Sequence, residues 1–467
     1  MLTRSPRRNA VTLLCLMALA LSAGAQTKRI KPPAEHLIFK CKALINPATG
    51  TTLENAFIET NGGRILRIGK AAELTASEGA KVVDYGDKYV IPGLIDTHGH
   101  LYGGITVRYT TSPLFPIFFM AAGVTSIGDP GSMDPGGDLA MRNRIDSGLY
   151  TGPRYFLAGE YLEMAPVTVG WMNPLATPEE ARLKVDRWAA EGISAIKIYA
   201  NMSGDVMQAA IDEAHEHGLR VWAHIGAVTY KQAMAMGVDQ LFHGALAMPD
   251  TRPPGITQKN FSAWADSTGT LDLSNPEILD VLRQAAAHKV VLTPTVVVLD
   301  ALLPGTMELH HMEEQKKYYA PQAWDKLVEY SHQFPGFKEE QVRSNVAKNI
   351  EFVRRAHDAG CILSTGTDLV VPAILPGFSL WREMELFSAG GLSPMEVLKA
   401  ATVNGAYALG RSDQLGTVEA GKLADFVVLS RNPLEDINNV RSVSRVVKGG
   451  VIYDPQELLK PLEGKVY

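Results

Sequence analysis

The sequence predicts an α/β fold, namely a TIM-like (β/α)8 barrel with a small β-sandwich built from both ends of the chain. Eight apolar, β-rich runs alternate with helical patterns through the middle of the chain, and both ends carry short strand patterns with Asn-Gly and Gly-Gly turns. Strands that alternate with helices indicate a parallel sheet buried on both faces, and eight such units are typical of a barrel. Tight turns between short strands favour antiparallel hairpins at the two ends.

Residues 1–25 precede the predicted domains and have the pattern of a signal peptide. A start with three arginines leads into an apolar run over 11–21 and then into Ala-Gly-Ala at 23–25, which fits a cleavage site. The apolar run is too short to span a bilayer. The paired arginines Arg7 and Arg8 leave both Sec and twin-arginine export open. We therefore expect an exported protein, either periplasmic or secreted.

The chain after residue 25 is mildly acidic and contains two cysteines. It carries 42 Lys and Arg against 50 Asp and Glu, a net charge of −8, and has no basic run. This balance argues against nucleic acid and anionic membranes as partners, whereas a homo-oligomer stays open. We expect Cys41 and Cys361 to be free thiols, because the apolar pattern around Cys361 predicts a buried strand.

The predicted domains follow from these patterns. Residues 26–88 and 412–467 form a composite β-sandwich domain, and residues 89–411 form the (β/α)8 domain. Residues from about 299 to 340 are longer than an ordinary loop and carry helical patterns, so they predict a helical insertion over the barrel mouth.

The eight apolar runs set the order of the barrel strands. The helix after the third run starts with Thr177 as N-cap and Pro178 at the first helical position, and Gly192 ends it. In chain order, the predicted strands lie within residues 89–100, 123–131, 154–162, 193–200, 220–227, 239–246, 290–298 and 361–368.

Four of the twelve histidines fall at the ends of predicted barrel strands. His98 and His100 end the first strand, and both imidazoles leave the same face because alternate residues of a strand share a face. His224 ends the fifth strand and His243 the sixth. Active sites of such barrels lie at the carboxyl ends of the strands, and imidazoles are common zinc ligands. The four histidines therefore predict a metal site at the barrel mouth.

Two charged residues join the histidines at predicted strand positions. Lys197 lies inside the apolar fourth strand, and Asp368 ends the eighth. A buried ammonium or carboxylate must be paired, modified or neutralised. An ion pair between these two residues is the simpler interpretation, but it leaves the histidines unexplained. The spacing follows units of roughly 30 residues, so all six side chains can converge at one mouth.

The combined pattern resembles the amidohydrolase superfamily in its binuclear-metal, carboxylated-lysine subtype. The shared features are His-x-His on strand one, Lys on strand four, His on strands five and six, and Asp on strand eight. The motifs "VIPGLIDTHGHL", "GVTSIGDPG", "IKIYA" and "TGTD" and the tail "GTVEAGKLADFVVLSRNPLED" extend the likeness over nearly the whole mature chain. The sequence is most similar to the imidazolonepropionase-like and Xaa-Pro dipeptidase-like branch.

This resemblance implies a metal-dependent hydrolase that holds two divalent ions. Zn²⁺ fits the ligand types best, and Mn²⁺, Co²⁺ and Fe²⁺ stay open. The resemblance implies that His98, His100 and Asp368 bind the more buried ion. It implies that His224 and His243 bind the more exposed one.

The resemblance also implies the chemistry of the remaining groups. Lys197 is expected to be carboxylated, so that its carbamate bridges both ions. A hydroxide held between two cations is available near neutral pH and attacks the scissile carbonyl. Asp368 takes the proton and passes it to the leaving group. The expected substrate is a small amide, peptide, N-acyl amino acid or lactam.

Substrate contacts and two rival functions stay open. Tyr161 and Trp171 are candidate substrate contacts, and Trp381 is a candidate wall of an apolar pocket. A mononuclear deaminase is the nearest rival, although the family's deaminases carry an acid where this chain has Ala227. A catalytically silent binding protein on the same fold is the other rival. Asp129, in "GDPG", either supports a metal ligand or lies in a turn, and we favour the turn.

Overall fold

The computed structural model describes most of the chain between residues 34 and 466. The exceptions are residues 76, 102–113, 168–171, 251, 254, 257–260, 307–311, 333–337 and 370–372. The predicted signal peptide, residues 1–25, and the candidate substrate contact Trp171 lie outside the described residues. Within the described part, no helix combines the length and apolar character that a membrane span requires.

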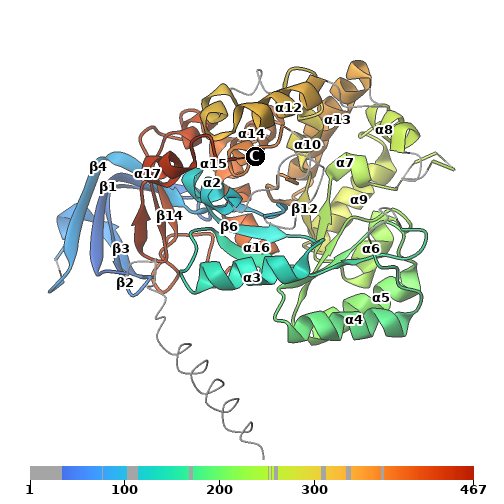
Figure 1. Cartoon of the computed structure of the whole chain (residues 1–467), viewed down its shortest axis with the longest axis horizontal. Coiled ribbons are helices and arrows are strands. Elements are labelled where there is room, and N and C mark those ends of the chain that lie inside the picture. Colours follow the sequence, from blue (N-terminus) through green and yellow to red (C-terminus); the bar gives the residue numbers. More distant parts are fainter. Residues whose placement is uncertain are drawn as a thin grey trace, which may run out of the picture.

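The two ends of the chain meet in one mixed sheet, which lies at one side of the molecule (Figure 1). Its central strand β4 (Lys81–Pro92) runs parallel to β1 and antiparallel to β14. Phe39, Ile58 and Phe426 belong to an apolar core that this sheet buries for itself. Across the sheet, the order is β16 (Val451–Tyr453), β15 (Val443–Lys448), β14 (Phe426–Leu429), β4, β1 (Leu37–Asn46), β2 (Thr51–Asn61) and β3 (Arg64–Lys70).

This arrangement agrees with a β domain built from both ends, but it differs from the expected sandwich in one respect. All seven strands pair into a single sheet, so strand pairing among the described residues does not separate two stacked sheets. The boundaries 26–88 and 412–467 stay a prediction.

The middle of the chain forms parallel strands in two open sheets. Every one of the eight predicted runs contains a strand, and the third run contains two. The smaller sheet has the order β5 (Leu94–Asp96), β6 (Val124–Asp129) and β7 (Arg154–Leu157). The larger sheet has the order β13 (Ile362–Leu363), β12 (Val291–Thr293), β11 (Gln240–Phe242), β10 (Arg220–Ala223), β9 (Ala195–Ile198) and β8 (Tyr161–Leu162).

Strand pairing among the described residues therefore does not close a full barrel, and a few hydrogen bonds outside the strand ladders connect the sheets instead. Gly159, at φ +70°, interrupts the third run between β7 and β8, and Ser194 N donates to Leu157 O at 2.8 Å. At the other junction, Thr97 N donates to Thr365 O at 3.0 Å. The chain bends at both places, so the evenly spaced bonds of a ladder cannot form. The fold is thus TIM-barrel-like, with two breaks in its hydrogen bonding.

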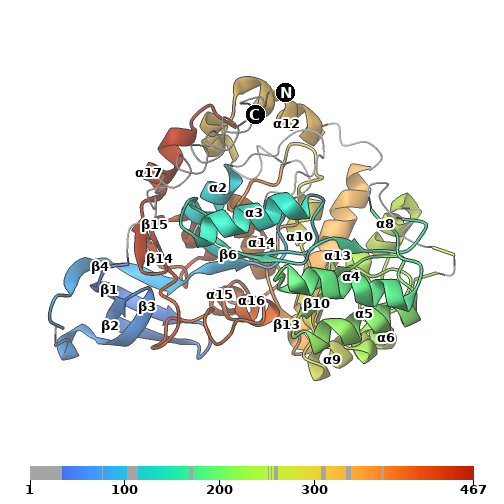
Figure 2. The ribbon, with the colours of Figure 1, turned by 60° about the horizontal axis from the view of Figure 1, so that its bottom comes forward.

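Helices follow the parallel strands, and α4, α5 and α9 lie on the side away from β1–β3 in both views (Figure 2). Helix α4 begins as expected, because the Thr177 side chain accepts a hydrogen bond from Glu180 N and Pro178 follows. The helices are α2 (Phe115–Ala121), α3 (Pro135–Asp146), α4 (Pro178–Ala190), α5 (Gly204–Glu216), α6 (Tyr230–Met236), α7 (Gly244–Ala247), α8 (Phe261–Gly269), α9 (Pro276–Ala287), α13 (Glu339–Asp358), α14 (Phe378–Ala389), α15 (Pro394–Ala400), α16 (Val403–Ala408) and α17 (Pro455–Leu459), with short 3-10 turns η1 (Ala71–Glu73), η3 (Ile437–Arg441) and η4 (Lys460–Leu462).

The predicted insertion between about 299 and 340 is helical in its described parts. It contains the end of α10 (Val296–Asp300), η2 (Met312–Tyr318) and α12 (Pro321–His332). The Tyr318 ring packs edge-on against Phe118 of α2 at 5.5 Å, and Tyr319 forms a bridge with Val466 near the chain's end. These contacts tie the insertion to α2 and to the C-terminal segment.

Candidate metal centre

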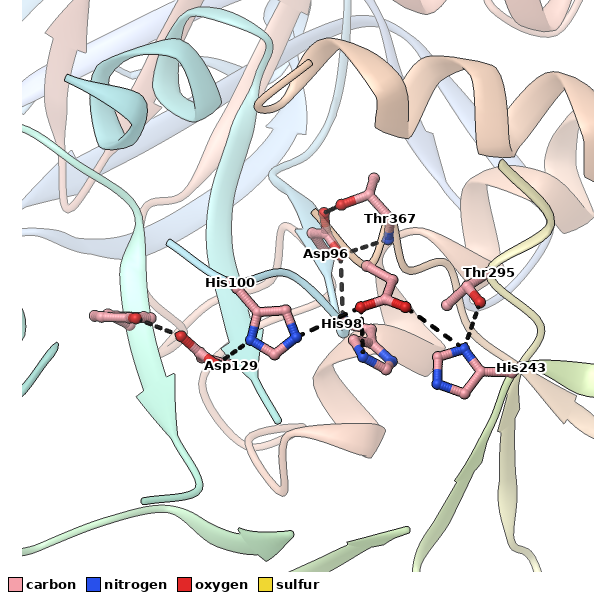
Figure 3. Close-up of polar contacts among 9 residues, drawn as sticks. Asp96, His98, His100, Asp129, His243, Thr295 and Thr367 are labelled. Carbon is pink, nitrogen blue, oxygen red and sulfur yellow. Dashed lines mark hydrogen bonds and ion pairs between the residues drawn. The ribbon is translucent and has the colours of Figure 1, made fainter. Parts of the chain in front are cut away.

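Three imidazoles surround one carboxylate just beyond the carboxyl ends of β5, β11 and β13 (Figure 3). Asp368 Oδ1 lies 3.2 Å from His98 Nε2 and 3.5 Å from His100 Nε2, and Asp368 Oδ2 lies 3.7 Å from His243 Nδ1. The three histidines are buried. Ligand atoms of His98, His243 and Asp368 all lie within 4.8 Å of one another, which is close enough to hold one cation.

The backbone at these positions is unusual and places the side chains. His243 and Asp368 have φ values of +69° and +49°, in the left-handed region that few non-glycine residues adopt. Thr295, at φ +48°, lies beside them, and its Oγ1 is 2.9 Å from His243 Nδ1. Such backbone strain persists only where the surrounding structure holds it, and it clusters at functional sites.

Asp96, which ends β5, holds the two arms of the site together. Its Oδ1 accepts hydrogen bonds from His98 N and Thr367 N, both at 3.1 Å, and its Oδ2 accepts one from Thr367 Oγ1 at 2.6 Å. Burial raises the pKa of the Asp96 carboxyl to about 7. This side chain therefore fixes the segment with His98 against the segment with Asp368.

Lys197 lies on β9 in an apolar environment, as its sequence context predicts. Its side chain is 1 % exposed, and its Nζ lies 4.0 Å from the centroid of the Phe242 ring, which also contacts His98 at 4.1 Å. Within the described part of the chain, Lys197 forms no ion pair within 4.0 Å, so the Lys197–Asp368 pair is not the explanation of its burial. Burial lowers the pKa of Lys197 to about 7, although Asp368 and Asp129 oppose the shift.

His224 completes the set of six predicted residues. It follows β10, and its ring lies 4.6 Å from the His243 ring and 4.7 Å from the Tyr199 ring. The structure therefore brings the side chains of all six predicted residues into one cluster. It also places His243 beside Asp368, two residues that the resemblance assigns to different ions.

The charges in this cluster oppose one another. Burial lowers the pKa of His98 to about 3, while Asp368 resists that shift. Burial likewise lowers the pKa of His243 well below its ordinary value, and the neighbouring His224 adds to the effect. Burial would raise the pKa of Asp368, but the nearby histidines hold it well below its usual range. Neutral His98 and His243 imidazoles beside an ionised Asp368 are the ligand forms that a divalent cation requires.

A buried nitrogen atom without a hydrogen-bond partner also supports a divalent metal at this site. His98 Nδ1 is buried and has no hydrogen-bond partner among the described groups. A buried polar atom without a partner is costly in a site made only for stability. Four imidazoles, one carboxylate and one lysine at strand ends match the nitrogen and oxygen ligands of zinc and related ions.

The favoured interpretation of Asp129 as a turn residue is wrong, and the structure agrees with the alternative, in which Asp129 contacts a candidate ligand. Asp129 is the last residue of β6, and its Oδ1 lies 2.8 Å from His100 Nδ1 (Figure 3). Burial would lower the pKa of His100, but the charge and hydrogen bond of Asp129 outweigh it and raise the pKa to about 10. The available signal was its place at the end of the second strand, which the Asp-Pro-Gly pattern concealed.

Tyr161 and Tyr199 form an aromatic wall beside the cluster. Tyr161 pairs with Lys197 across β8 and β9 and packs on Gly131, where an added Cβ would come within 2.7 Å of its ring. The sequence interpretation did not include Tyr199, whose ring meets Tyr161 edge-on at 5.3 Å. Its signal was the spacing of two residues from Lys197, which places both side chains on one face of a strand.

Trp381 lies elsewhere, so its assignment to the metal centre's pocket is wrong. It sits on α14, and its Nε1 donates to Ala122 O at 3.1 Å. It lines a separate cavity of about 1000 Å³ between α14, η2, η3 and α17. Beside it on α14, the Phe378 ring packs edge-on against Phe118 of α2 at 6.1 Å.

Comparison with known proteins places this geometry in a family. A sequence profile described as the amidohydrolase family matches residues 89–453. The imidazolonepropionase of Phocaeicola vulgatus is 37 % identical over 107 residues, which are 21 % of this chain and 25 % of that protein. The imidazolonepropionase of Deinococcus radiodurans is 46 % identical over 78 residues, 16 % of this chain and 19 % of that protein. These matches thus span a quarter or less of the curated relatives.

Solved structures agree over nearly the whole chain. A Xaa-Pro dipeptidase with bound methionine has a TM-score of 0.67 at 20 % identity and covers 90 % of this chain and 99 % of its own, which shows the shared fold. A candidate prolidase from Bifidobacterium longum has a TM-score of 0.67 at 27 % identity and covers 92 % of this chain and 100 % of its own. With the profile matched over most of its length, the chain belongs to the amidohydrolase family.

Proposed function

We propose that this protein is a metal-dependent hydrolase that cleaves an amide-type C–N bond of a small peptide, an N-acyl amino acid or a lactam. The observation that carries the proposal is the convergence of three buried histidines on Asp368, with Lys197 and His224 beside them. The resemblance to imidazolonepropionases and to a Xaa-Pro dipeptidase supports a lactam-like or peptide substrate.

The proposed site holds two divalent ions, with Zn²⁺ favoured by the ligand types. His98, His100 and Asp368 hold one ion, and His224 and His243 hold the other. When bound, the ions lower the pKa of water from 15.7 to about 7 and polarise the scissile carbonyl.

Lys197 is the proposed bridge in its carboxylated form. With its pKa near 7, much of this amine is unprotonated at neutral pH and can attack carbon dioxide. The new N–C bond forms as the nitrogen releases one proton, and the product is an anionic carbamate. The exchange replaces a cation that two divalent ions would repel with two anionic oxygens that they attract.

Asp368 is the proposed proton carrier. Its carboxylate is ionised near neutral pH because of the surrounding histidines, and it lies at the centre of the cluster. It accepts the proton of the attacking water and delivers it to the leaving nitrogen. Tyr161 and Tyr199 line the wall that a substrate would meet.

Metal content and turnover together test this proposal. We expect about two divalent ions per chain by elemental mass spectrometry, and turnover of at least one member of a panel of dipeptides, N-acyl amino acids and lactams. Lys197→Ala should lose metal and turnover together, whereas Lys231→Ala, at a partly exposed lysine paired with Asp280, should keep both. One ion per chain would favour a mononuclear deaminase, and none would favour a silent binding protein. Full activity of Lys197→Ala would contradict the bridging role.

We also propose that residues 1–25 direct export of the protein. The support is their charge pattern and the Ala-Gly-Ala sequence at 23–25. Amino-terminal sequencing of the protein from fractionated cells should find a mature chain that begins at Gln26 outside the cytoplasm. An intact amino terminus in the cytoplasmic fraction would refute this.

A further inference from the structure

A chain of buried polar groups runs outward from His100, away from the other ligands. His100 Nδ1 lies 2.8 Å from Asp129 Oδ1, and the Tyr155 hydroxyl lies 2.5 Å from Asp129 Oδ2. The same hydroxyl lies 2.8 Å from Asp138 Oδ1, and the Ser132 hydroxyl donates to the other oxygen of Asp138. Asp129, Asp138, Tyr155 and Ser132 are each at most 4 % exposed.

Counting hydrogens gives this chain one consistent arrangement. The Tyr155 hydroxyl carries a single hydrogen, so it cannot donate to both carboxylates. Asp129 already accepts a hydrogen bond from His100 Nδ1, and the negative charge of the Asp129 carboxylate stabilises the hydrogen on that nitrogen. If Asp138 carries a proton on Oδ1, it donates to Tyr155, Tyr155 donates to Asp129, and every contact then joins one donor to one acceptor.

The opposite arrangement, with both carboxylates ionised, leaves a defect. The oxygens of Asp129 and Asp138 on the Tyr155 hydroxyl would then compete for one hydrogen, and two buried negative charges would face each other. Burial and the charge of Asp129 raise the pKa of Asp138 to about 7, so the neutral acid is well populated at neutral pH and predominates below it. Burial raises the pKa of Tyr155 well above its ordinary value, so this residue stays a donor.

We propose that Asp138 is a positioning residue that, as a neutral acid, orients Tyr155 and Asp129 so that His100 keeps its hydrogen on Nδ1 and turns Nε2 toward the metal site. This inference rests on the proposed metal centre and deepens it. Asp138 does not touch the reacting groups and acts only through Tyr155 and Asp129.

The elements that carry the chain are suited to this task. Asp129 ends β6 and Tyr155 lies on the neighbouring β7, one strand further from His100. Asp138 lies in the first turn of α3, whose N-cap Asp134 accepts a hydrogen bond from Gly137 N. Ser132 accepts a hydrogen bond from Asp134 N while it donates to Asp138, so the start of the helix and the acid are fixed together.

Three variants of the full chain test the proposal: Asp138→Asn, Asp138→Ala and Asp129→Asn. Asparagine at 138 supplies an amide N–H toward Tyr155 in place of the acid O–H and keeps an oxygen for Ser132. We expect it to change Zn²⁺ affinity, measured by competition with a chromophoric chelator, by less than about threefold. Asp129→Asn removes the charged partner of His100 and should weaken Zn²⁺ by about 10- to 100-fold. Asp138→Ala should fall between them, nearer to Asp129→Asn.

A second readout needs no metal. The infrared spectrum of the metal-free protein should contain a carbonyl band of a protonated carboxylic acid that disappears in Asp138→Asn. If Asp138→Ala does not fold, Tyr155→Phe replaces it. In Tyr155→Phe, the Asp138 carbonyl band should shift but stay in the spectrum, because the protonated acid loses the Tyr155 hydroxyl that accepts its hydrogen bond.

The outcomes separate this inference from the proposed function. If Asp138→Asn weakens Zn²⁺ binding as much as Asp129→Asn does, or if Asp138→Asn loses no protonated-acid band relative to the unmodified protein, the neutral acid is refuted. If the unmodified protein binds no divalent ion, the proposed function fails, but the infrared comparison still decides whether Asp138 carries the proton.

Discussion

The amino group of Lys197 lies against the face of the Phe242 ring. The burial of this group lowers the stability of the metal-free protein, whereas the proposed function requires the group. A buried ammonium is costly to desolvate, and a cation–π contact recovers only part of that cost. The proposed bridge gives a reason to keep the residue, because a carbamate at this place would satisfy two cations.

Replacing this lysine should therefore separate stability from activity. We expect Lys197→Met to raise the free energy of unfolding of the metal-free protein by about 1–4 kcal/mol, since an apolar group of similar volume replaces a buried charge. The same variant should bind no bridging pair of metals and show no turnover. Urea unfolding of metal-free samples gives the first quantity and elemental analysis the second. A less stable metal-free variant would contradict the cost assigned to the ammonium.

The two cysteines give a second prediction at the residue scale. Cys41 and Cys361 are free thiols, as the sequence predicts. Burial raises the pKa of both thiols to about 12 from an unfolded value of 9.0. A raised pKa suppresses the reactive thiolate below that pH, so at pH 8 the folded protein should have about 1,000-fold less thiolate than the unfolded chain.

Labelling with Ellman's reagent measures this difference. Both cysteines should react slowly in the folded protein at pH 8 and rapidly in urea, and the folded rate should rise as the pH approaches 12 only if the fold survives. Peptide mass spectrometry locates the labelled sites. Rapid labelling of either cysteine in the folded protein at pH 8 would contradict the raised pKa of that thiol.

At the scale of elements, the break in the third strand places the side chain of Tyr161 beside the candidate metal centre. The ladder of β7 with β6 ends at Leu157, and beyond Gly159 the third run pairs with β9 through β8, so that Tyr161 lies opposite Lys197. The position demands glycine for two reasons. Its φ is +70°, and an added Cβ would lie 2.9 Å from the Trp188 ring.

A matched pair of alanine substitutions can separate these two reasons. Gly218, after α5, has a similar φ of +67° but nothing within 4 Å of an added Cβ. Gly218→Ala should cost about 1–2 kcal/mol for the left-handed backbone alone. Gly159→Ala should cost about 1–3 kcal/mol more, because the ring of Trp188 must move. Chemical unfolding of both variants gives their free energies of unfolding. An equal loss of stability in the two variants would mean that the Trp188 ring moves aside without strain.

At the scale of the whole molecule, the seven-stranded sheet is connected to the parallel strands both along the chain and by an ion pair. β4 lies in the middle of the seven-stranded sheet and leads directly into β5, which precedes His98 and His100. Arg154, at the start of β7, forms a bidentate ion pair of 2.7 and 3.0 Å with Asp425 beside β14. Asp425 also accepts a hydrogen bond from Gly449 N at 2.6 Å. This carboxylate therefore joins the C-terminal strands to the strands that carry the site.

Removing this link should weaken the whole fold. We expect Asp425→Ala to lower the free energy of unfolding by about 3–5 kcal/mol, because it leaves a largely buried guanidinium and a backbone N–H without their acceptor. Glu35→Ala, which breaks an exposed pair with Lys81, is the control and should have no measurable effect. If scanning calorimetry of Asp425→Ala shows an early transition for one part only, the two parts unfold separately and the link is local.

Local sequence patterns were enough to determine the eight strand positions, the start of α4, the free cysteines and the six residues that gather at the candidate site. Each of these depends on neighbours along the chain: alternation in a strand, a capping residue, or a charge inside an apolar run. The resemblance to the amidohydrolase family added the chemistry that these residues are expected to perform.

Only the tertiary structure decided which distant groups meet. In the structure, Asp129 contacts His100 and His243 lies beside Asp368. Trp381 lines another cavity. The strand pairing of the barrel is open near Gly159 and beyond Thr97. The physical reason is that hydrogen bonds and ion pairs depend on distances between atoms from different strands. Those distances follow from packing and from left-handed turns at single residues, which no periodicity along the chain records.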